Sequence, residues 1–305
     1  MARSKEKRKV TGKGRRKDAI LKHIFVYGLL AVPIIHFIVF WFMVNVDSLL
    51  LPFLDNQTGE FTLHNFKVIF ESLKVGGELA IAFKNTLIYW VSGLFCQYVL
   101  ALSVTYFLYK KIFMHRFFTF LFMVPSILSS VVLVAIYKNL VGSTGPLAVI
   151  YEALFQKTMP SLLYSNATAT WTIVVFCVWT GFGMNVILFS GAMSKIPNEI
   201  VEAANLDGAG FFREFLSIEL PMIMPTVLIM LLFSVSGILM SSGPILLFTG
   251  GMYETTTISY WFYENVIVNR DYGVSSAFGL LLSLVAVPLV LIVNHISNKM
   301  EVVEY

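Results

Sequence analysis

The segment 195–221 combines charged side chains with turn residues in an ordered, amphipathic pattern that suits recognition by another protein. It contains five carboxylates against two cations: Glu199, Glu202, Asp207, Glu214 and Glu219, with Lys195 and Arg213. Pro197 and Asn198 are favourable residues for starting a helix, which we expect to run to about Leu206. The run Asp207-Gly208-Ala209-Gly210 should end it, because glycine accepts the positive φ of a helix end. A second short helix is expected before Pro221, so the segment forms a helical bracket.

No set of residues suited to catalysis or metal binding is found elsewhere. His36 and His295 lie in long apolar runs that offer no carboxylate to orient them, so we expect no catalytic residue. Cys96 and Cys177 also lie in apolar runs, with no metal-site spacing and no disulfide framework. An intramembrane enzyme is therefore disfavoured.

The composition places the chain in a membrane. Of its 305 residues, 57% are hydrophobic and 13% charged, against roughly 25% charged in soluble domains. Crossing a bilayer takes about 20 apolar residues as a helix, and the runs lack the alternation of a β-barrel. We therefore predict an all-α transmembrane fold with domain 23–305 and a basic tail 1–22. The six spans are expected at about 24–46, 86–109, 117–138, 169–191, 223–248 and 273–298, with the bracket as a cytoplasmic loop 195–221.

Lysine and arginine predict the orientation. Residues 1–22 hold ten of the 22 such residues, which places the N-terminus in the cytoplasm by the positive-inside rule. Six spans then return the C-terminus to the same side. The tail is interpreted as a topogenic segment, with a lipid- or nucleic-acid-binding arm as the less favoured alternative.

The stretch Glu202 to Pro225, EAANLDGAGFFREFLSIELPMIMP, resembles the EAA loop of permeases of binding-protein-dependent ABC importers. All fixed positions of that pattern are present: Glu202, Ala203, Ala204, Asp207, Gly208, Ala209, Ile218, Leu220 and Pro221. The resemblance covers the chain from about Phe61 and implies a six-span type I importer permease. It also implies that the loop couples to an ATPase, through Glu202, Ala203, Ala204, Asp207, Gly208, Ala209 and Gly210.

Further motifs are similar to those of the carbohydrate-uptake branch, on the side of the maltose and glycerol-phosphate permeases. They are Trp179-Thr180-Gly181, Phe248-Thr249-Gly250-Gly251 and the run 271–277, although Met252-Tyr253-Glu254 replaces the usual Gly-Pro continuation. The resemblance implies a sugar pathway at Thr180, Gly181, Met184, Ser234, Gly237, Ile238 and Ser241. Gly237 and Ile238 lack the ring and amide of the maltose permease, so the sugar or its binding should differ. A phosphorylated polyol is the alternative solute.

The resemblance also implies partners in a cell-membrane complex: a second, related permease, two ATPase subunits, an external solute-binding protein and the sugar. No Asp, Glu or Arg lies within the expected spans and no GxxxxGK[ST] P-loop occurs. We therefore expect no cofactor in this chain, ATP and magnesium being bound by the partner ATPase. A non-ABC carrier is the less favoured alternative.

Ser234, Gly237 and Ser241 have the spacing i, i+3, i+7, which would place them on one face of the fifth helix, with Ser242 one step round. Gly243-Pro244 just beyond should loosen this helix and could free a carbonyl for a ligand. Such a stripe could bind solute, or it could pack against a neighbouring helix through small residues.

Overall fold

A computed structural model describes residues 12–56 and 58–299. Half of the basic tail, residues 1–11, lies outside the described part, so its interpretation stays a prediction. Within the described residues the secondary structure is helical, apart from one isolated bridge between Leu54 and Phe61. In the described part of the chain, six helical segments are long and apolar enough to cross a membrane: Lys22–Phe53, Glu78–Tyr109, Ser130–Phe155, Ala169–Met193, Phe211–Ser236 and Tyr272–His295. The predicted all-α, six-span fold is confirmed.

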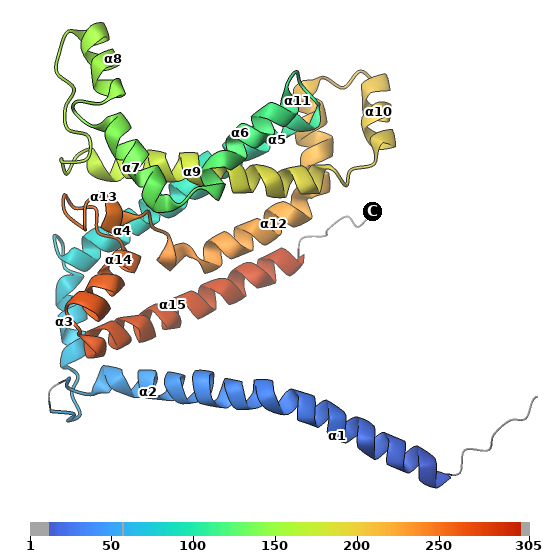
Figure 1. The fold of residues 1–305 in the computed structure, drawn as a ribbon, viewed down its shortest axis with the longest axis vertical. Coiled ribbons are helices and arrows are strands. Elements are labelled where there is room, and N and C mark those ends of the chain that lie inside the picture. The colour runs from blue at the N-terminus through green and yellow to red at the C-terminus, as the bar shows by residue number, and fades with distance from the viewer. Residues whose placement is uncertain (1–11, 57, 300–305) are drawn as a thin grey trace, which may run out of the picture.

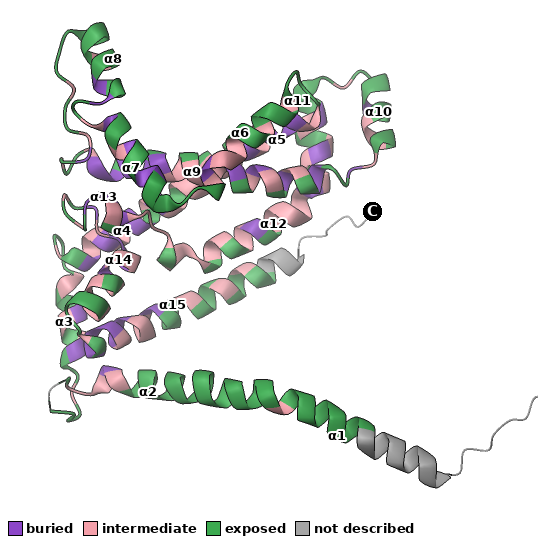
Figure 2. Cartoon of the chain, in the orientation of Figure 1, coloured by how far each residue is buried: buried purple, intermediate pink, exposed green. Residues whose placement is uncertain are grey.

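The first span stands apart from the rest of the chain. Helix α1 (Gly12–His36) continues through a π-helical turn, η1 (Phe37–Met43), into α2 (Val44–Leu50). Figure 1 shows this rod diverging from the body. Its described side chains from Lys22 to Leu50 are exposed, with Ala31 half-buried (Figure 2). The short helix η2 (Leu51–Phe53) then packs against the last span, α15 (Tyr272–Lys299).

The second and fourth spans form the centre of the bundle. The second is α4 (Glu78–Ser92), a π-helical turn η3 (Gly93–Gln97) and α5 (Tyr98–Tyr109). It packs along α9 (Ala169–Met193), where Ala101, Val186 and Phe189 are buried together. Helix α6 (His115–Ile127) also packs on α9, so closely that a Cβ at Gly183 would overlap the Phe122 carbonyl. These contacts fix the helices that surround the candidate site.

The third hydrophobic run is two helices rather than one. Helix α6 ends at Ile127, and α7 (Ser130–Val141) begins after the extended residues Leu128 and Ser129. The expected span 117–138 therefore contains a break, beside Pro125, whose ring removes a backbone donor. A short apolar helix, α8 (Pro146–Phe155), follows.

The fifth span is also interrupted, which corrects the expected continuous run 223–248. Helix α12 (Leu220–Ser236) ends at Gly237, and a 3-10 turn, η5 (Ile238–Met240), and residues 241–244 lead into α13 (Ile245–Phe248). Glycine is a poor interior helix residue, and Pro244 cannot donate a backbone hydrogen bond. Ser241 therefore does not share a helix face with Ser234, and the expected stripe does not exist as a single surface.

The helices bring different segments together at the two ends of the bundle (Figure 1). At one end, called the loop end, lie α10 (Asn198–Leu206), α11 (Phe211–Glu214) and the π-helical turn η4 (Phe215–Glu219). At the other, called the far end, lie α3 (His64–Ser72), α8, α13 and α14 (Ile258–Tyr263), which is followed by η6 (Glu264–Val268).

Candidate functional site

The bracket at the loop end has the local structure that its residues predict. Helix α10 begins after Pro197 and ends at Leu206. The backbone then reverses, with Gly208 at φ +73° and the amide of Ala209 donating to the carbonyl of Ala204 at 3.0 Å. A glycine is required at 208 because side chains rarely adopt this φ without strain.

Most of α10 and its turn faces solvent. Ala204 is the buried residue of α10, while Glu202, Ala203, Asp207, Gly208 and Gly210 are exposed and Ala209 is half-buried. Leu206 is 89% exposed, and Phe212 at the start of the next helix is 74% exposed. The bracket therefore presents carboxylates beside large apolar side chains, a combination suited to docking another protein.

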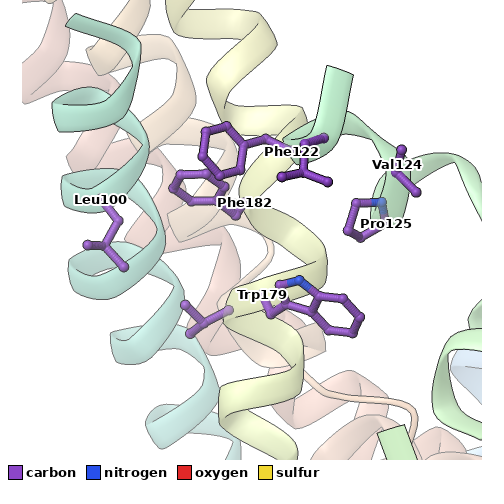
Figure 3. Close-up of a pocket in the computed structure, with 8 residues that line it drawn as sticks. Leu100, Phe122, Val124, Pro125, Trp179 and Phe182 are labelled. Atoms are coloured by element: carbon purple, nitrogen blue, oxygen red, sulfur yellow. The ribbon is translucent and has the colours of Figure 1, made fainter. Parts of the chain in front are cut away.

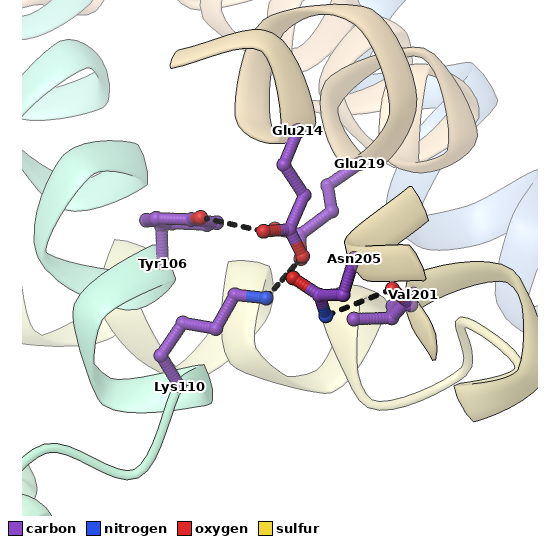
Figure 4. A network of polar contacts seen from close by, with 6 residues as sticks. All are labelled: Tyr106, Lys110, Val201, Asn205, Glu214 and Glu219. Atoms are coloured by element: carbon purple, nitrogen blue, oxygen red, sulfur yellow. Dashed lines mark hydrogen bonds and ion pairs between the residues drawn. The ribbon is translucent and has the colours of Figure 1, made fainter. Parts of the chain in front are cut away.

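A buried ionic cluster joins the bracket to the end of α5 (Figure 4). Lys110 forms an ion pair with Glu214 and lies 3.7 Å from Oε1 of Glu219. Tyr106 donates its hydroxyl to Oε2 of Glu214 at 3.4 Å. The ring of Phe211 packs edge-on against Tyr106, with the ring centroids 4.7 Å apart. The second span and the bracket are therefore held by charge and by aromatic packing together.

The cluster carries two carboxylates for one ammonium group. Glu219 is fully buried, and neither of its oxygens has a hydrogen-bond partner among the described residues. Burying a charge is unfavourable unless it is paired. The Lys110 ammonium group therefore has to compensate the charges of both carboxylates. The sequence indicates the two carboxylates but not their cation, because Lys110 is about a hundred residues distant and lies in a segment that has the pattern of a plain turn.

A second feature is a cavity of about 370 Å³ near the middle of the bundle, called the midspan pocket. The second span contributes Gln97 and α9 contributes Thr180 and Gly181. The interrupted fifth span contributes Ser242 together with Gly243 and Pro244. Irregular backbone at membrane depth is tolerated where it lines a cavity, and interrupted helices commonly mark solute sites in transporters.

Gln97 connects the second span to α9 at this pocket through a hydrogen bond of its side-chain amide. Its Nε2 donates to the carbonyl of Cys177 at 2.6 Å. A Cβ at Gly181 would overlap the same amide, so glycine at 181 makes room for it. Sequence reasoning missed Gln97, although an amide within the apolar run 85–109 was the available signal.

The expected pathway residues are only partly brought together. Thr180 and Gly181 line the midspan pocket, whereas Ser234, Gly237, Ile238 and Ser241 are not among its lining residues, and Met184 is exposed on α9. Ser242, which the expected stripe includes one step round from Ser241, does line the pocket. The pathway assignment of the remaining residues stays a prediction.

Neighbouring side chains partner the carbonyls around the break in the fifth span. Trp90 donates its Nε1 to the carbonyl of Ser234 at 3.0 Å, and Ser259 donates its hydroxyl to that of Met240 at 3.2 Å. The hydroxyls of Ser242 and Thr257 lie 2.7 Å apart. Because polar backbone in an apolar medium needs partners, these contacts make the break a stable feature of the fold.

A larger cavity of about 450 Å³ between α5, α6 and α9 has a different character (Figure 3). Figure 3 shows the rings of Phe122 and Phe182 together above Trp179, with Pro125 to one side and Leu100 on α5. Its lining is almost wholly apolar. Such walls cannot partner the hydroxyls of a sugar, so this cavity suits an apolar neighbour such as a lipid chain or a helix.

Comparisons with known proteins agree with these features. The model of the family described as "Binding-protein-dependent transport system inner membrane component" matches residues 97–302. The multiple sugar-binding transport system permease protein MsmF of Streptococcus mutans is 27% identical over 290 residues, covering 93% of this chain and 98% of the relative. The arabinooligosaccharides transport system permease protein AraP of Halalkalibacterium halodurans is 25% identical, covering 90% and 93%.

A shorter match and a solved structure complete the comparison. The sn-glycerol-3-phosphate transport system permease protein UgpA of Yersinia enterocolitica is 31% identical over 131 residues, 42% of this chain and 44% of the relative. The crystal structure of a bacterial ABC transporter involved in the import of the acidic polysaccharide alginate has a chain that aligns with a TM-score of 0.81. It is 21% identical and covers 94% of this chain and 99% of that chain, which shows a shared fold.

Proposed function

Because this chain belongs to the family of binding-protein-dependent transport system inner membrane components, we propose that it forms the sugar pathway of an ABC importer driven by a separate ATPase. It is a multi-pass membrane protein and a transport subunit rather than an enzyme. The observation that carries the proposal is the interrupted fifth span, whose Ser242 lines the midspan pocket at the middle of α9 together with Gln97 and Thr180.

The loop end is the cytoplasmic end in this proposal, and both termini lie in the cytoplasm. Two ATPase subunits bind magnesium and ATP; one docks on α10, around Glu202 to Gly210, and the other on a second, related permease. The exposed Leu206 and Phe212 support this, since ordered apolar side chains on a solvated helix mark a docking surface. The external solute-binding protein delivers its ligand at the far end.

The transported solute is a sugar or an oligosaccharide. Two relatives that match almost the whole chain are named for sugars or arabinooligosaccharides, whereas the glycerol-phosphate relative matches 42% of it. The lining of the midspan pocket contains Gln97, Thr180 and Ser242 but no lysine, arginine or histidine. Phosphate is normally bound by such cations, so this pocket favours a neutral, hydroxylated ligand over a phosphorylated polyol.

ATP hydrolysis is coupled to transport because the bracket, where the ATPase docks, is connected to the midspan pocket. Closure of the ATPase dimer displaces α10, and the cluster of Lys110 with Glu214 and Glu219 transmits the displacement to α5 and α12. The first residue of α5, Tyr98, follows Gln97, and the last residue of α12, Ser236, precedes the break in the fifth span. Both helices therefore lead from the cluster to the midspan pocket. A near-rigid rotation of the spans would thus open the midspan pocket to alternate sides.

The proposal is tested by uptake of oligosaccharides into proteoliposomes that contain the whole complex and its binding protein. Thr180→Trp should fill the midspan pocket and reduce uptake at least tenfold while basal ATP hydrolysis and assembly persist. Thr180→Val is the matched control, since the Thr180 hydroxyl bonds to the Phe176 carbonyl of its own helix at 3.0 Å. Wild-type uptake by the tryptophan variant would contradict a pathway through this pocket.

A further inference from the structure

A small cavity of about 180 Å³, called the outer pocket, lies at the far end where the second and fourth spans meet the loop of residues 249–257. Its polar lining comprises an ammonium group, two amides, a hydroxyl, an indole and a carboxylate: Lys84, Asn85, Asn166, Thr170, Trp171 and Glu254. None of these residues belongs to the midspan pocket. The amide oxygens of Asn85 and Asn166, the Thr170 hydroxyl and the Glu254 carboxylate offer acceptors for hydroxyl groups, and the Lys84 ammonium group offers donors.

The carboxylate is held in place by a strained backbone. Tyr253 has φ 58° and Glu254 has φ 53°, values that non-glycine residues seldom adopt. Asn85, which is buried, donates its amide to the carbonyls of Glu254 at 2.6 Å and Thr256 at 2.9 Å. Asn166 donates to Oε1 of Glu254 at 3.0 Å. Strain that is fixed by several bonds clusters at functional sites, and here it fixes the position of Glu254.

The charges that line the outer pocket stay apart. Among the described side chains, no ion pair within 4.0 Å joins Lys84 to Glu254, so the two charges do not neutralise each other. Trp171 is 56% exposed, which leaves an indole surface beside these charges. An aromatic surface next to separated polar groups suits a sugar ring, whose C–H face packs on the indole while its hydroxyls bond to charged groups.

A buried hydroxyl, that of Tyr89, lies close to residues of both pockets. Tyr89 is one helical turn below Asn85 on α4 and is 5% exposed, and its hydroxyl has no hydrogen-bond partner among the described residues. A Cβ at Gly243 would lie 3.2 Å from the Tyr89 ring and 2.9 Å from the Cys177 sulfur, and both Gly243 and Cys177 line the midspan pocket. An unpartnered buried hydroxyl is rare and needs an explanation.

The two pockets are also aligned along α9. Thr170 lines the outer pocket, while Cys177 and Gly181 line the midspan pocket, at a spacing of i, i+7, i+11. This spacing keeps the three on one face, with a rise of roughly 10 Å between Thr170 and Cys177. The packed side chains of Tyr89 and Ile173 lie in the same cluster as Ile88, which lines the outer pocket.

We propose that the outer pocket is a subsite that binds one glycosyl unit on its way in, and that the Tyr89 hydroxyl beneath it is a gate group that bonds to the sugar as it passes to the midspan pocket. This proposal rests on the proposed function. When the pathway is closed, the hydroxyl is buried without a partner. When the spans separate, it bonds to the sugar, which lowers the barrier to passage.

The test measures uptake of radiolabelled raffinose and maltotriose by the reconstituted complex, with binding-protein docking and basal ATP hydrolysis followed in parallel. Trp171→Ala should raise KM for uptake about tenfold with kcat nearly unchanged, and Trp171→Phe should restore most of the affinity. Glu254→Gln should raise KM severalfold. Glu71→Gln, at an exposed carboxylate of α3 outside the pocket, should have no effect.

The substitution Tyr89→Phe tests whether the Tyr89 hydroxyl acts in sugar passage or only in the stability of the fold. Removing an unpartnered buried hydroxyl should leave the melting temperature unchanged or raise it, yet kcat for uptake should fall at least threefold. Wild-type kcat, or a parallel loss of melting temperature and uptake, would overturn the gate role.

Two further outcomes distinguish the subsite from the proposed function. If the wild-type complex transports either sugar but Trp171→Ala and Glu254→Gln have wild-type KM, the outer subsite is refuted and the proposed function stands. If it transports sn-glycerol 3-phosphate and neither sugar, the proposed function fails and the glycosyl subsite fails with it.

Discussion

The two ends of the bundle are built differently. At the far end, buried side chains hold the loop of residues 249–257: Asn85 bonds to two of its carbonyls, Thr249 and Thr255 bond to each other at 2.6 Å, and Thr86 accepts from the amide of Ile258. At the loop end, α10 buries only Ala204. The difference suggests that the far end keeps its shape to receive a ligand, whereas the bracket is presented to a partner that moves it.

The largest effect is expected from breaking the turn after α10. Gly208→Pro cannot adopt φ +73°, because proline fixes φ near −65°. The change should abolish ligand-stimulated ATP hydrolysis while the chain still reaches the membrane. Gly191→Ala in α9 is the matched control: nothing lies within 4 Å of its Cβ and its φ is not positive, so stimulation should persist. Stimulated turnover in the proline variant would show that the bracket does not couple.

The next effect concerns the cluster that joins the bracket to α5. Lys110→Met leaves Glu214 and Glu219 buried without a cation, which should destabilise the fold by about 3–5 kcal/mol. The melting temperature of the purified complex measures the loss. The triple variant with Glu214→Gln and Glu219→Gln should recover much of it, because no charge then remains buried. A melting temperature unchanged by Lys110→Met would mean that the cluster does not hold the bracket.

A smaller effect should sharpen the contrast between the ends. Asn85→Leu removes two hydrogen bonds and leaves the carbonyls of Glu254 and Thr256 unpartnered, at a cost of about 1–3 kcal/mol. Amide hydrogen exchange in residues 249–257 should become faster, while exchange in α10 stays fast and unchanged. If amide exchange in the wild-type protein is equally slow in residues 249–257 and in α10, the two ends do not differ in rigidity and the comparison is wrong.

Sequence reasoning was most successful where a short pattern determines local structure. The six apolar runs, the bracket and the turn at Gly208 follow from hydrophobicity and from glycine and proline chemistry within a few residues. The broken fifth span was only partly predictable: Gly243-Pro244 indicates a loosened helix, but Gly237 alone does not reveal that α12 stops at Ser236. Gln97 and Lys110 could not be placed, since their partners Cys177, Glu214 and Glu219 lie about 80 to 110 residues away. Only the packing of η3 on α9 and of the bracket on the end of α5 brings them close.

The source of energy separates the proposed importer from its main rival. Glu219 is buried next to a membrane span with one shared cation, so a proton-driven carrier that uses this carboxylate is the rival that the structure adds. In an ATP-driven importer, by contrast, Glu219 is a fixed part of the bracket, and energy enters from ATP at α10.

The most direct test is uptake of oligosaccharide into cells that express the complete transporter, with a protonophore added while intracellular ATP is held constant. An ATP-driven importer should continue uptake at the same rate without a proton gradient and should stop when ATP is depleted. Loss of uptake on adding the protonophore, at unchanged ATP, would contradict the ATP-driven mechanism.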